Sequence, residues 1–279
     1  MKNVKELISS SRLPARDATI VMAHILHQDK SYVLAHQDDM PTLFEHIRWY
    51  WGSNQLRHGW SVAHTTGHKE FFGLDFLVNR HTLIPRPDTE IMVETVLEIL
   101  NQNTKQTAVL DIGTGSGCIA IALAKNNPLP LYYGSDISHR ALRIAKANAK
   151  YNQVTIDWRY GNLLTPFWSE LFWGEPTASI IITANLPYLT PEQLAGEPNI
   201  QKEPVTALVS GIDGLDAYRA LLTQLQQLHS PAAVTVLMEI DPSQVSGIGK
   251  VLSELLPAWT VITKADLQGR SRLVIISNR

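Results

Sequence analysis

From Ala108 onward, short runs of β-branched residues alternate with longer stretches of helical spacing. Successive parallel strands must be joined by crossovers, so this alternation predicts an α/β fold, a mostly parallel sheet covered by helices on both faces. The expected strands are 108–112, 131–136, 154–160, 179–184, 232–240, 259–264 and 271–277. The expected helices are 117–126, 139–151, 216–229 and 243–256.

The last two expected strands, WTVITKAD and SRLVIISN, are separated only by LQGR. This connection is too short for a helical crossover, so the two strands must form an antiparallel hairpin. A Rossmann-like, doubly wound sheet that ends in such a hairpin is the arrangement of class I methyltransferases. We therefore expect residues 88–279 to form a methyltransferase domain.

The first 68 residues have helical spacing without strand alternation, and they predict a small helical domain over 1–68. Its histidines show no plausible cluster of three or four ligands, so no metal site is expected. Residues 69–87 are interpreted as a β-hairpin linker. A helix then opens at Pro87, and the acidic residues near its start (Asp88, Glu90 and Glu94) are interpreted as simple capping.

Composition narrows the function classes. The formal net charge is -2, so no general basic excess draws the chain to nucleic-acid phosphates, and sequence-specific nucleic-acid binding is not expected. Cys118, the one cysteine, cannot form an internal disulfide and is expected to be a small buried packing residue. With no signal-peptide pattern and no long apolar run, we expect a cytoplasmic protein without membrane spans.

A glycine loop follows the first strand of the alternating region. In VLDIGTGSGCIAIALA, Gly113, Gly115 and Gly117 recur at every second position before a helix. Glycines allow a sharp turn and close approach to a ligand, and Asp136, at the end of the next strand, is placed for two ribose hydroxyls. The pattern G-x-G-x-G after Asp111 differs from the G-x-G-x-x-G of dinucleotide-binding folds. It favours S-adenosylmethionine as the cofactor.

A second candidate site is the turn NLPY, which follows the apolar run SIII. Pro187 cannot donate to a sheet, so the strand should end there and leave Asn185 and Leu186 at its exit. A delocalised amide or exocyclic amine needs both N–H groups held by fixed acceptors. The Asn185 side-chain carbonyl and the Leu186 backbone carbonyl are candidate acceptors, and Tyr188 is a candidate platform for a planar group.

Several motifs together resemble the HemK/PrmC family, the glutamine-N5 methyltransferases of peptide chain release factors. They are TLIPRPDTE, VLDIGTGSGCIAIALA, NLPY, EP…AL…GIDGLDAYR, a final D…G…R and, in the helical domain, ARDATIVMAHIL. The resemblance implies methyl transfer from S-adenosylmethionine to the glutamine of a Gly-Gly-Gln loop, with release factors as partners. It also implies that the helical domain helps to dock the factor.

The candidate residues follow from these motifs. The catalytic set is Asn185, Leu186, Pro187 and Tyr188; the cofactor-binding set is Asp111, Gly113, Thr114, Gly115, Gly117, Asp136, Asn162, Leu163 and Asn185. The sequence departs from the family pattern at Leu186, where a proline is usual, at Asn162, where an acid is common, and at Asp241–Pro242, where a glycine is usual. Two alternatives stay open: an RNA or DNA adenine-N6 methyltransferase, and a non-catalytic cofactor-binding protein that only docks its partner.

Overall fold

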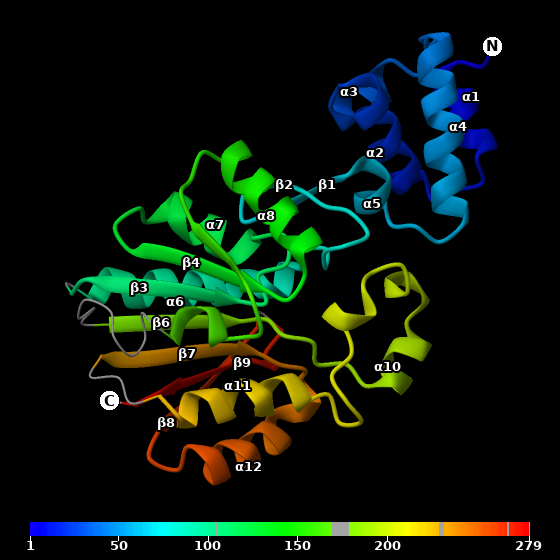
Figure 1. Ribbon diagram of the computed structural model, residues 1–279. Helices are drawn as coiled ribbons and strands as arrows, with labels where there is room; N and C mark the ends of the chain where they lie inside the picture. Colours follow the sequence, from blue (N-terminus) through cyan, green and yellow to red (C-terminus); the bar gives the residue numbers. More distant parts are fainter. Residues whose placement is uncertain (104, 169–178, 229–231, 267, 279) are drawn as a thin grey trace. The chain divides into compact units, whose positions relative to one another are not determined.

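The computed structural model describes residues 1–103, 105–168, 179–228, 232–266 and 268–278 (Figure 1). These residues form two compact units, which are described separately. Unit 1 comprises Met1–His68 and Pro198–Lys202, and unit 2 comprises Lys69–Glu197 and Glu203–Arg279. No helix in the described ranges is both long enough and apolar enough to cross a membrane.

Unit 1 is helical. Its helices are α1 (Val4–Ser10), α2 (Ala15–Leu26), α3 (Lys30–Ala35), α4 (Leu43–Arg57) and α5 (Val62–Thr66). Capping boxes begin α1 at Asn3 and α4 at Thr42, which satisfies backbone N–H groups that have no partner within the helix. A small core of aliphatic side chains and Trp49 joins the helices. Lys202 from the distant segment lies over the ring of Trp60, 5.9 Å from its centre.

Unit 2 begins with a two-stranded sheet, β1 (His68–Phe71) and β2 (Leu74–Leu77). Phe71 and Phe76 are buried in the main core of this unit. Asn148, from a helix of that core, accepts a hydrogen bond from the backbone N–H of Leu77 at 2.7 Å and donates one to its carbonyl at 3.0 Å. The hairpin is therefore packed onto unit 2 along its length.

A seven-stranded sheet forms the centre of unit 2, in the order β5-β4-β3-β6-β7-β9-β8. Its strands are β3 (Thr107–Ile112), β4 (Leu131–Asp136), β5 (Asp157–Tyr160), β6 (Ser179–Ala184), β7 (Ala233–Glu239), β8 (Thr260–Ala265) and β9 (Ser271–Ser277). The first five pair in parallel, whereas β9 is antiparallel to β7 and β8. The doubly wound sheet with a final antiparallel hairpin is thus confirmed.

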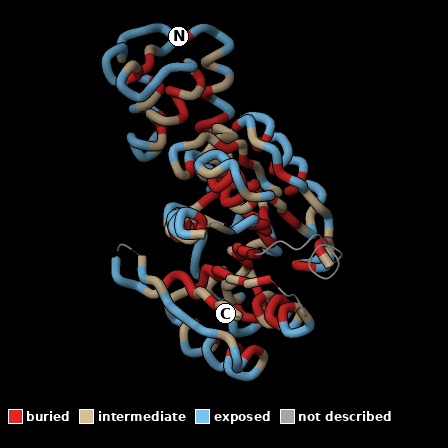
Figure 2. The backbone as a smooth tube through the Cα atoms, turned by 90° about the vertical axis from the view of Figure 1, so that its left-hand side faces the viewer, coloured by how far each residue is buried: buried red, intermediate tan, exposed pale blue. Residues whose placement is uncertain are grey.

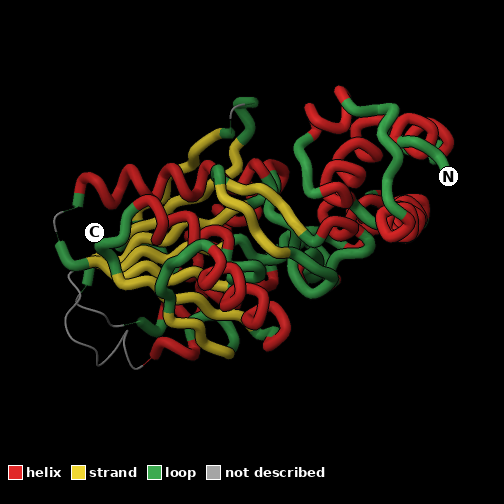
Figure 3. The backbone as a smooth tube through the Cα atoms, turned by 90° about the horizontal axis from the view of Figure 1, so that it is seen from above, coloured by secondary structure: helices red, strands yellow, loops and turns green. Residues whose placement is uncertain are grey.

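Helices cover both faces of this sheet (Figures 1 and 3). One core contains α6 (Glu90–Gln102), α7 (Cys118–Asn126) and α8 (His139–Tyr151), and the other contains α11 (Asp216–Gln226) and α12 (Val245–Leu255). Along β3, Val109 faces the first core, and Leu110 and Ile112 face the second, as the strand period of two requires. Figure 2 shows buried segments, in red, inside unit 2. A short helix, α10 (Pro191–Gly196), lies outside these layers.

Three expected elements differ from the structure by more than one residue at a boundary. Strand 154–160 begins only at Asp157, because the N–H of Val154 still bonds the carbonyl of Ala149 in the end of α8. The expected helix 243–256 splits into a 3-10 turn, Pro242–Gln244, and α12. Helix 216–229 ends at Gln226; residue 229 lies outside the described residues.

Candidate active site

A cavity of about 610 Å³ lies in unit 2, next to the carboxyl ends of β3, β4 and β6. The chain leaves β3 for β4 on one side, and β6 returns on the other side, so this edge is the switch point where doubly wound sheets bind ligands. Of the sequence-predicted residues, the cavity is lined by Gly113, Thr114, Gly115, Asp136, Asn162, Leu163, Asn185, Leu186 and Pro187. Asp111, Gly117 and Tyr188 do not line it.

The first and last glycines of the loop, Gly113 and Gly117, are required for different structural reasons. Gly113 has φ +69°, and a Cβ there would meet Cδ2 of Leu186 at 2.8 Å, so a missing side chain lets the loop lie against the NLPY turn. Gly117 has φ +82° and caps α7. A Cβ there would meet Ile121 and Trp158 at 2.9 Å, inside the core. Gly113 therefore shapes the cavity, whereas Gly117 allows packing beneath it.

Asp136, the last residue of β4, presents its carboxylate to the cavity. Its Oδ2 accepts a hydrogen bond from the N–H of Gly115 at 2.9 Å, and its Oδ1 accepts one from the N–H of Ser138 at 2.8 Å. Burial raises the pKa of Asp136, and these two bonds act in the opposite direction. A carboxylate has about four acceptor positions, so both oxygens can still accept from a diol.

Asp111 lies beneath the loop, fully buried at 1% exposure. Its carboxylate accepts hydrogen bonds from the hydroxyls of Thr114 at 2.5 Å and Thr183 at 2.8 Å. Burial raises the pKa of Asp111 to about 6 despite these bonds. Since only Thr114 of this trio lines the cavity, Asp111 acts on the site by holding the loop.

Asn162 and Leu163 follow β5 and line another part of the cavity. Leu163 has φ +53°, an uncommon conformation for a side-chain-bearing residue. Its carbonyl accepts a hydrogen bond from the hydroxyl of Ser135 at 3.0 Å, which ties this turn to β4. Cys118 also lines the cavity, but burial raises the pKa of its thiol to about 12. The expectation of a buried packing cysteine is confirmed.

The NLPY turn is held from several sides. The side-chain Nδ2 of Asn185 donates to the hydroxyl of Thr89 at 3.0 Å. The N–H of Leu186 donates to the hydroxyl of Tyr218 at 3.3 Å, and the Leu186 side chain is buried. The hydroxyl of Tyr188 donates to Oε1 of Glu239 at 3.4 Å. The role of Tyr188 as a platform stays a prediction.

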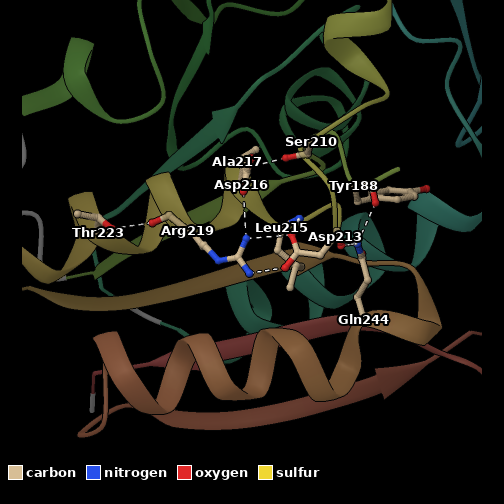
Figure 4. Close-up of polar contacts among 9 residues, drawn as sticks. All are labelled: Tyr188, Ser210, Asp213, Leu215, Asp216, Ala217, Arg219, Thr223 and Gln244. Atoms are coloured by element: carbon tan, nitrogen blue, oxygen red, sulfur yellow. Dashed lines mark hydrogen bonds and ion pairs between the residues drawn. The ribbon is translucent and has the colours of Figure 1, made fainter. Parts of the chain in front are cut away.

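The segment GIDGLDAYR lies next to Tyr188 of the NLPY turn, and Gln244 joins the two (Figure 4). Arg219 bridges the carboxylates of Asp213 and Asp216, and its hydrogen bond to Asp213 Oδ1 measures 2.9 Å. The amide Nε2 of Gln244 donates to the backbone carbonyls of Tyr188 at 2.8 Å and Asp213 at 3.1 Å. Gly214 has φ +74°, and a Cβ there would fall on the Tyr188 carbonyl, which explains this glycine.

The unusual Asp241–Pro242 pair sits at the same support. Asp241 caps the 3-10 turn with its side chain: Oδ1 accepts from the N–H of Ser243 at 2.9 Å. This turn carries Gln244, which holds Tyr188. Asp241, where the family usually has a glycine, therefore caps the turn that positions Gln244.

The capping interpretation of the acidic residues after Pro87 is wrong for two of them. Helix α6 has no side-chain cap hydrogen bond at its start. Asp88 instead forms an ion pair with Arg272 at 3.1 Å, and Glu90 accepts a hydrogen bond from the N–H of Phe72 at 2.9 Å. The motif IPRPDTE therefore fastens distant segments together, a role that local spacing cannot reveal.

Sequence reasoning also missed four residues around the site. Thr89 contacts Asn185, Glu239 contacts Tyr188, and Arg86 forms an ion pair with the buried Glu203. Three of them lie in motifs that could have identified them: Arg86 and Thr89 in TLIPRPDTE, and Glu203 in the EP motif. Glu239 lies in neither motif. Among the described residues, no group of three His, Cys, Asp or Glu side chains is placed to hold a metal ion.

Comparisons with known proteins agree with this geometry. Residues 88–172 match the family model "Methyltransferase small domain". A release factor glutamine methyltransferase of Koribacter versatilis is 34% identical over 94% of this chain and 90% of its own length. One from Bacillus anthracis is 32% identical over 91% of this chain and 89% of its own length.

Solved structures support the fold alone. The hMettl16 catalytic domain in complex with MAT2A 3'UTR hairpin 1 has a TM-score of 0.57 at 15% identity, covering 92% of this chain and 90% of that one. At 15% identity, this structural similarity does not indicate which substrate the chain uses. The sequence relatives, by contrast, match this chain over most of its length. The chain therefore belongs to the release factor glutamine methyltransferase family.

Proposed function

We propose that this protein transfers a methyl group from S-adenosylmethionine to the side-chain amide nitrogen, N5, of the glutamine in a release factor's Gly-Gly-Gln motif. The observation that carries this proposal is the orientation of Asn185 at the cavity. Its Nδ2 donates one N–H to Thr89, and its carbonyl oxygen is the acceptor that the side chain offers to a ligand. An amide nitrogen offers hydrogen-bond donors that such an oxygen can accept.

The residues present fit this cofactor. The Asp136 carboxylate, already fixed by Gly115 and Ser138, would accept the two ribose hydroxyls. The loop at Gly113 and Gly115 would lie against the rest of the molecule without side chains in the way. When bound, S-adenosylmethionine supplies an electrophilic methyl group on its sulfonium sulfur.

The chain's own contribution is alignment. The Asn185 side-chain carbonyl and the Leu186 backbone carbonyl would each accept one N–H of the glutamine amide and hold its nitrogen in line with the methyl carbon. With the cofactor bound, that nitrogen would take the methyl group as the carbon–sulfur bond breaks, and it would lose one proton, while Asn185 and Leu186 keep it in position. Fixing a weak nucleophile in this way can supply much of the catalysis.

The test is to locate the transferred methyl group. The full chain is incubated with labelled S-adenosylmethionine and a release factor, or an RNA with unpaired adenines, and the label is mapped by mass spectrometry. We expect label on the Gly-Gly-Gln glutamine and none on a factor in which that glutamine is replaced by asparagine. Label on adenine N6 would favour the first alternative, and cofactor binding without transfer to either substrate would favour the docking protein.

Docking of the factor is assigned to unit 1, through helix α4. Five large apolar side chains lie exposed on one face of this helix: Leu43, Phe44, Ile47, Tyr50 and Trp51, at 48–68% exposure. Trp49 and Gly52 on the other face are buried. A face with clustered aromatic side chains is typical of protein–protein contacts.

This docking role has its own experiment. Phe44→Ala and Trp51→Ala should each raise the KM for the whole release factor by roughly tenfold, the effect of one interface anchor, while the KM for a short Gly-Gly-Gln peptide stays unchanged. Tyr151→Ala, at 56% exposure in unit 2, is the matched control. An equal KM for the factor in all three variants would remove α4 from the interface.

A further inference from the structure

Glu239, the last residue of β7, is a buried carboxylate that the proposed methyl transfer does not use. It is 1% exposed, and among the described residues its Oε2 has no partner at ordinary hydrogen-bond distance. Burial raises the pKa of Glu239 to about 7, against the lowering effects of Thr89, Arg272 and Tyr188. A buried charged group with an unused acceptor is costly, so its presence requires an explanation.

Thr89 connects this carboxylate to the candidate catalytic turn. Its hydroxyl accepts from Nδ2 of Asn185 at 3.0 Å and is close enough to Glu239 to lower the pKa of that carboxyl. A hydroxyl has one proton, and an ionised carboxylate can only accept. An ionised Glu239 favours a Thr89 hydroxyl whose proton is turned toward the carboxylate, and this rotamer leaves the hydroxyl lone pairs for Nδ2 of Asn185.

The direction of these bonds matters because an asparagine amide fits almost equally well in two orientations that differ by a half-turn. Asn185 lines the cavity, and with Nδ2 held by Thr89 its carbonyl oxygen is the end of the amide that is turned away from Thr89. In the reversed orientation the Asn185 NH₂ group would face the N–H groups of the substrate nitrogen, and neither side would offer an acceptor.

We propose that Glu239, acting through Thr89, is a positioning residue that keeps the Asn185 carbonyl turned toward the substrate nitrogen. This inference rests on the proposed function for the identity of the substrate, but the same orientation is needed for an exocyclic amine. The hydroxyl of Tyr188 on Oε1 of Glu239 ties the other end of the turn to the same carboxylate.

The charged and titratable groups around Glu239 come from several elements. Arg272 on β9 lowers its pKa, whereas Asp88, before α6, raises it. Tyr218 on α11 donates to the Glu239 backbone carbonyl, and burial raises the pKa of that phenol well above its usual value. Burial likewise raises the pKa of the Tyr188 phenol, so neither phenol titrates near neutral pH. Cys118 on α7 stays a thiol.

The test compares Glu239→Gln with Thr89→Val, Thr89→Ser and the wild-type chain. A glutamine at position 239 can turn its NH₂ toward Thr89 and reverse the hydroxyl, whereas valine cannot hold Asn185 at all. We expect both Glu239→Gln and Thr89→Val to lower kcat by roughly tenfold to a hundredfold, with KM and S-adenosylmethionine affinity within twofold. Thr89→Ser keeps the hydroxyl and should retain most of the activity.

The pH profile provides a readout that packing alone would not move. Wild-type kcat should fall as the pH drops below about 7, where Glu239 takes up a proton, and this limb should vanish in Glu239→Gln. Thr95→Val is the matched control, because that buried hydroxyl bonds only its own helix, at the Ile91 carbonyl. Its profile should match the wild type.

Wild-type kcat in both Glu239→Gln and Thr89→Val would overturn the inference. So would a loss that follows a lower melting temperature and appears equally in Thr95→Val. If the wild-type chain labels adenine and no release factor, the proposed function fails. The same variants then test the positioning role on the adenine substrate, so the two failures are distinguishable.

Discussion

Replacing Gly113 with alanine tests the contact between the glycine loop and the NLPY turn. Gly113 has φ +69°, and a Cβ would lie 2.8 Å from Cδ2 of Leu186. The left-handed backbone costs a side-chain-bearing residue about 1–2 kcal/mol, and forcing Leu186 aside costs about 1–3 kcal/mol more. Gly113→Ala should therefore destabilise unit 2 by roughly 2–5 kcal/mol in total.

Gly73→Ala is the matched control, because Gly73 has φ +71° with nothing within 4 Å of the added Cβ. It should show only the backbone cost, about 1–2 kcal/mol. Urea unfolding followed by tryptophan fluorescence gives both values, and turnover is measured on the folded variants. We expect Gly113→Ala to lose turnover as well, since Leu186 carries a candidate acceptor. Equal destabilisation by both variants, with normal turnover in Gly113→Ala, would show that the close contact between Gly113 and Leu186 shapes neither stability nor the site.

Three further predictions use the same site. Asp136→Ala should weaken S-adenosylmethionine binding by roughly 1.5–3 kcal/mol, the worth of charge-assisted hydrogen bonds; unchanged calorimetric affinity would exclude Asp136 as the ribose ligand. Leu186→Pro loses the 3.3 Å bond to Tyr218, about 1 kcal/mol, but stiffens the unfolded chain by a similar amount, so its melting temperature should stay near that of wild type. Hydrogen bonding to Arg219 lowers the pKa of Asp213 to about 2; the resulting stability is present above about pH 4 and lost as the pH falls toward 2, and Asp213→Asn should show a flatter acid unfolding curve.

The fold was largely predictable from local pattern. Strand and helix periods placed the alternating elements, and the short LQGR connection required an antiparallel end, both of which the sheet confirms. The exception at 154–156 arose because Val154 is taken up by the end of α8. Periodicity cannot detect that competition for a backbone N–H.

The site was less predictable because its supports lie far apart in the sequence. Gly113 and Asn185 stand directly after strands and Asp136 is the last residue of one, so the topology brings all three to one edge of the sheet. Thr89 and Glu239 reach the NLPY turn from positions 96 residues before and 51 residues after the residues that they contact. Periodicity marks neither residue, since Thr89 precedes a helix and Glu239 ends a strand; only the motif TLIPRPDTE could have pointed to Thr89.

Methyl transfer as proposed depends above all on Asn185, which aligns the substrate amide. The most direct measurement is the single-turnover rate of methyl transfer to a release factor by Asn185→Ala, at saturating cofactor, with melting temperature and S-adenosylmethionine affinity measured alongside. We predict a rate lower by roughly a hundredfold or more, with the melting temperature and affinity close to wild type. A near-normal rate would contradict the claim and make the NLPY turn a structural element only.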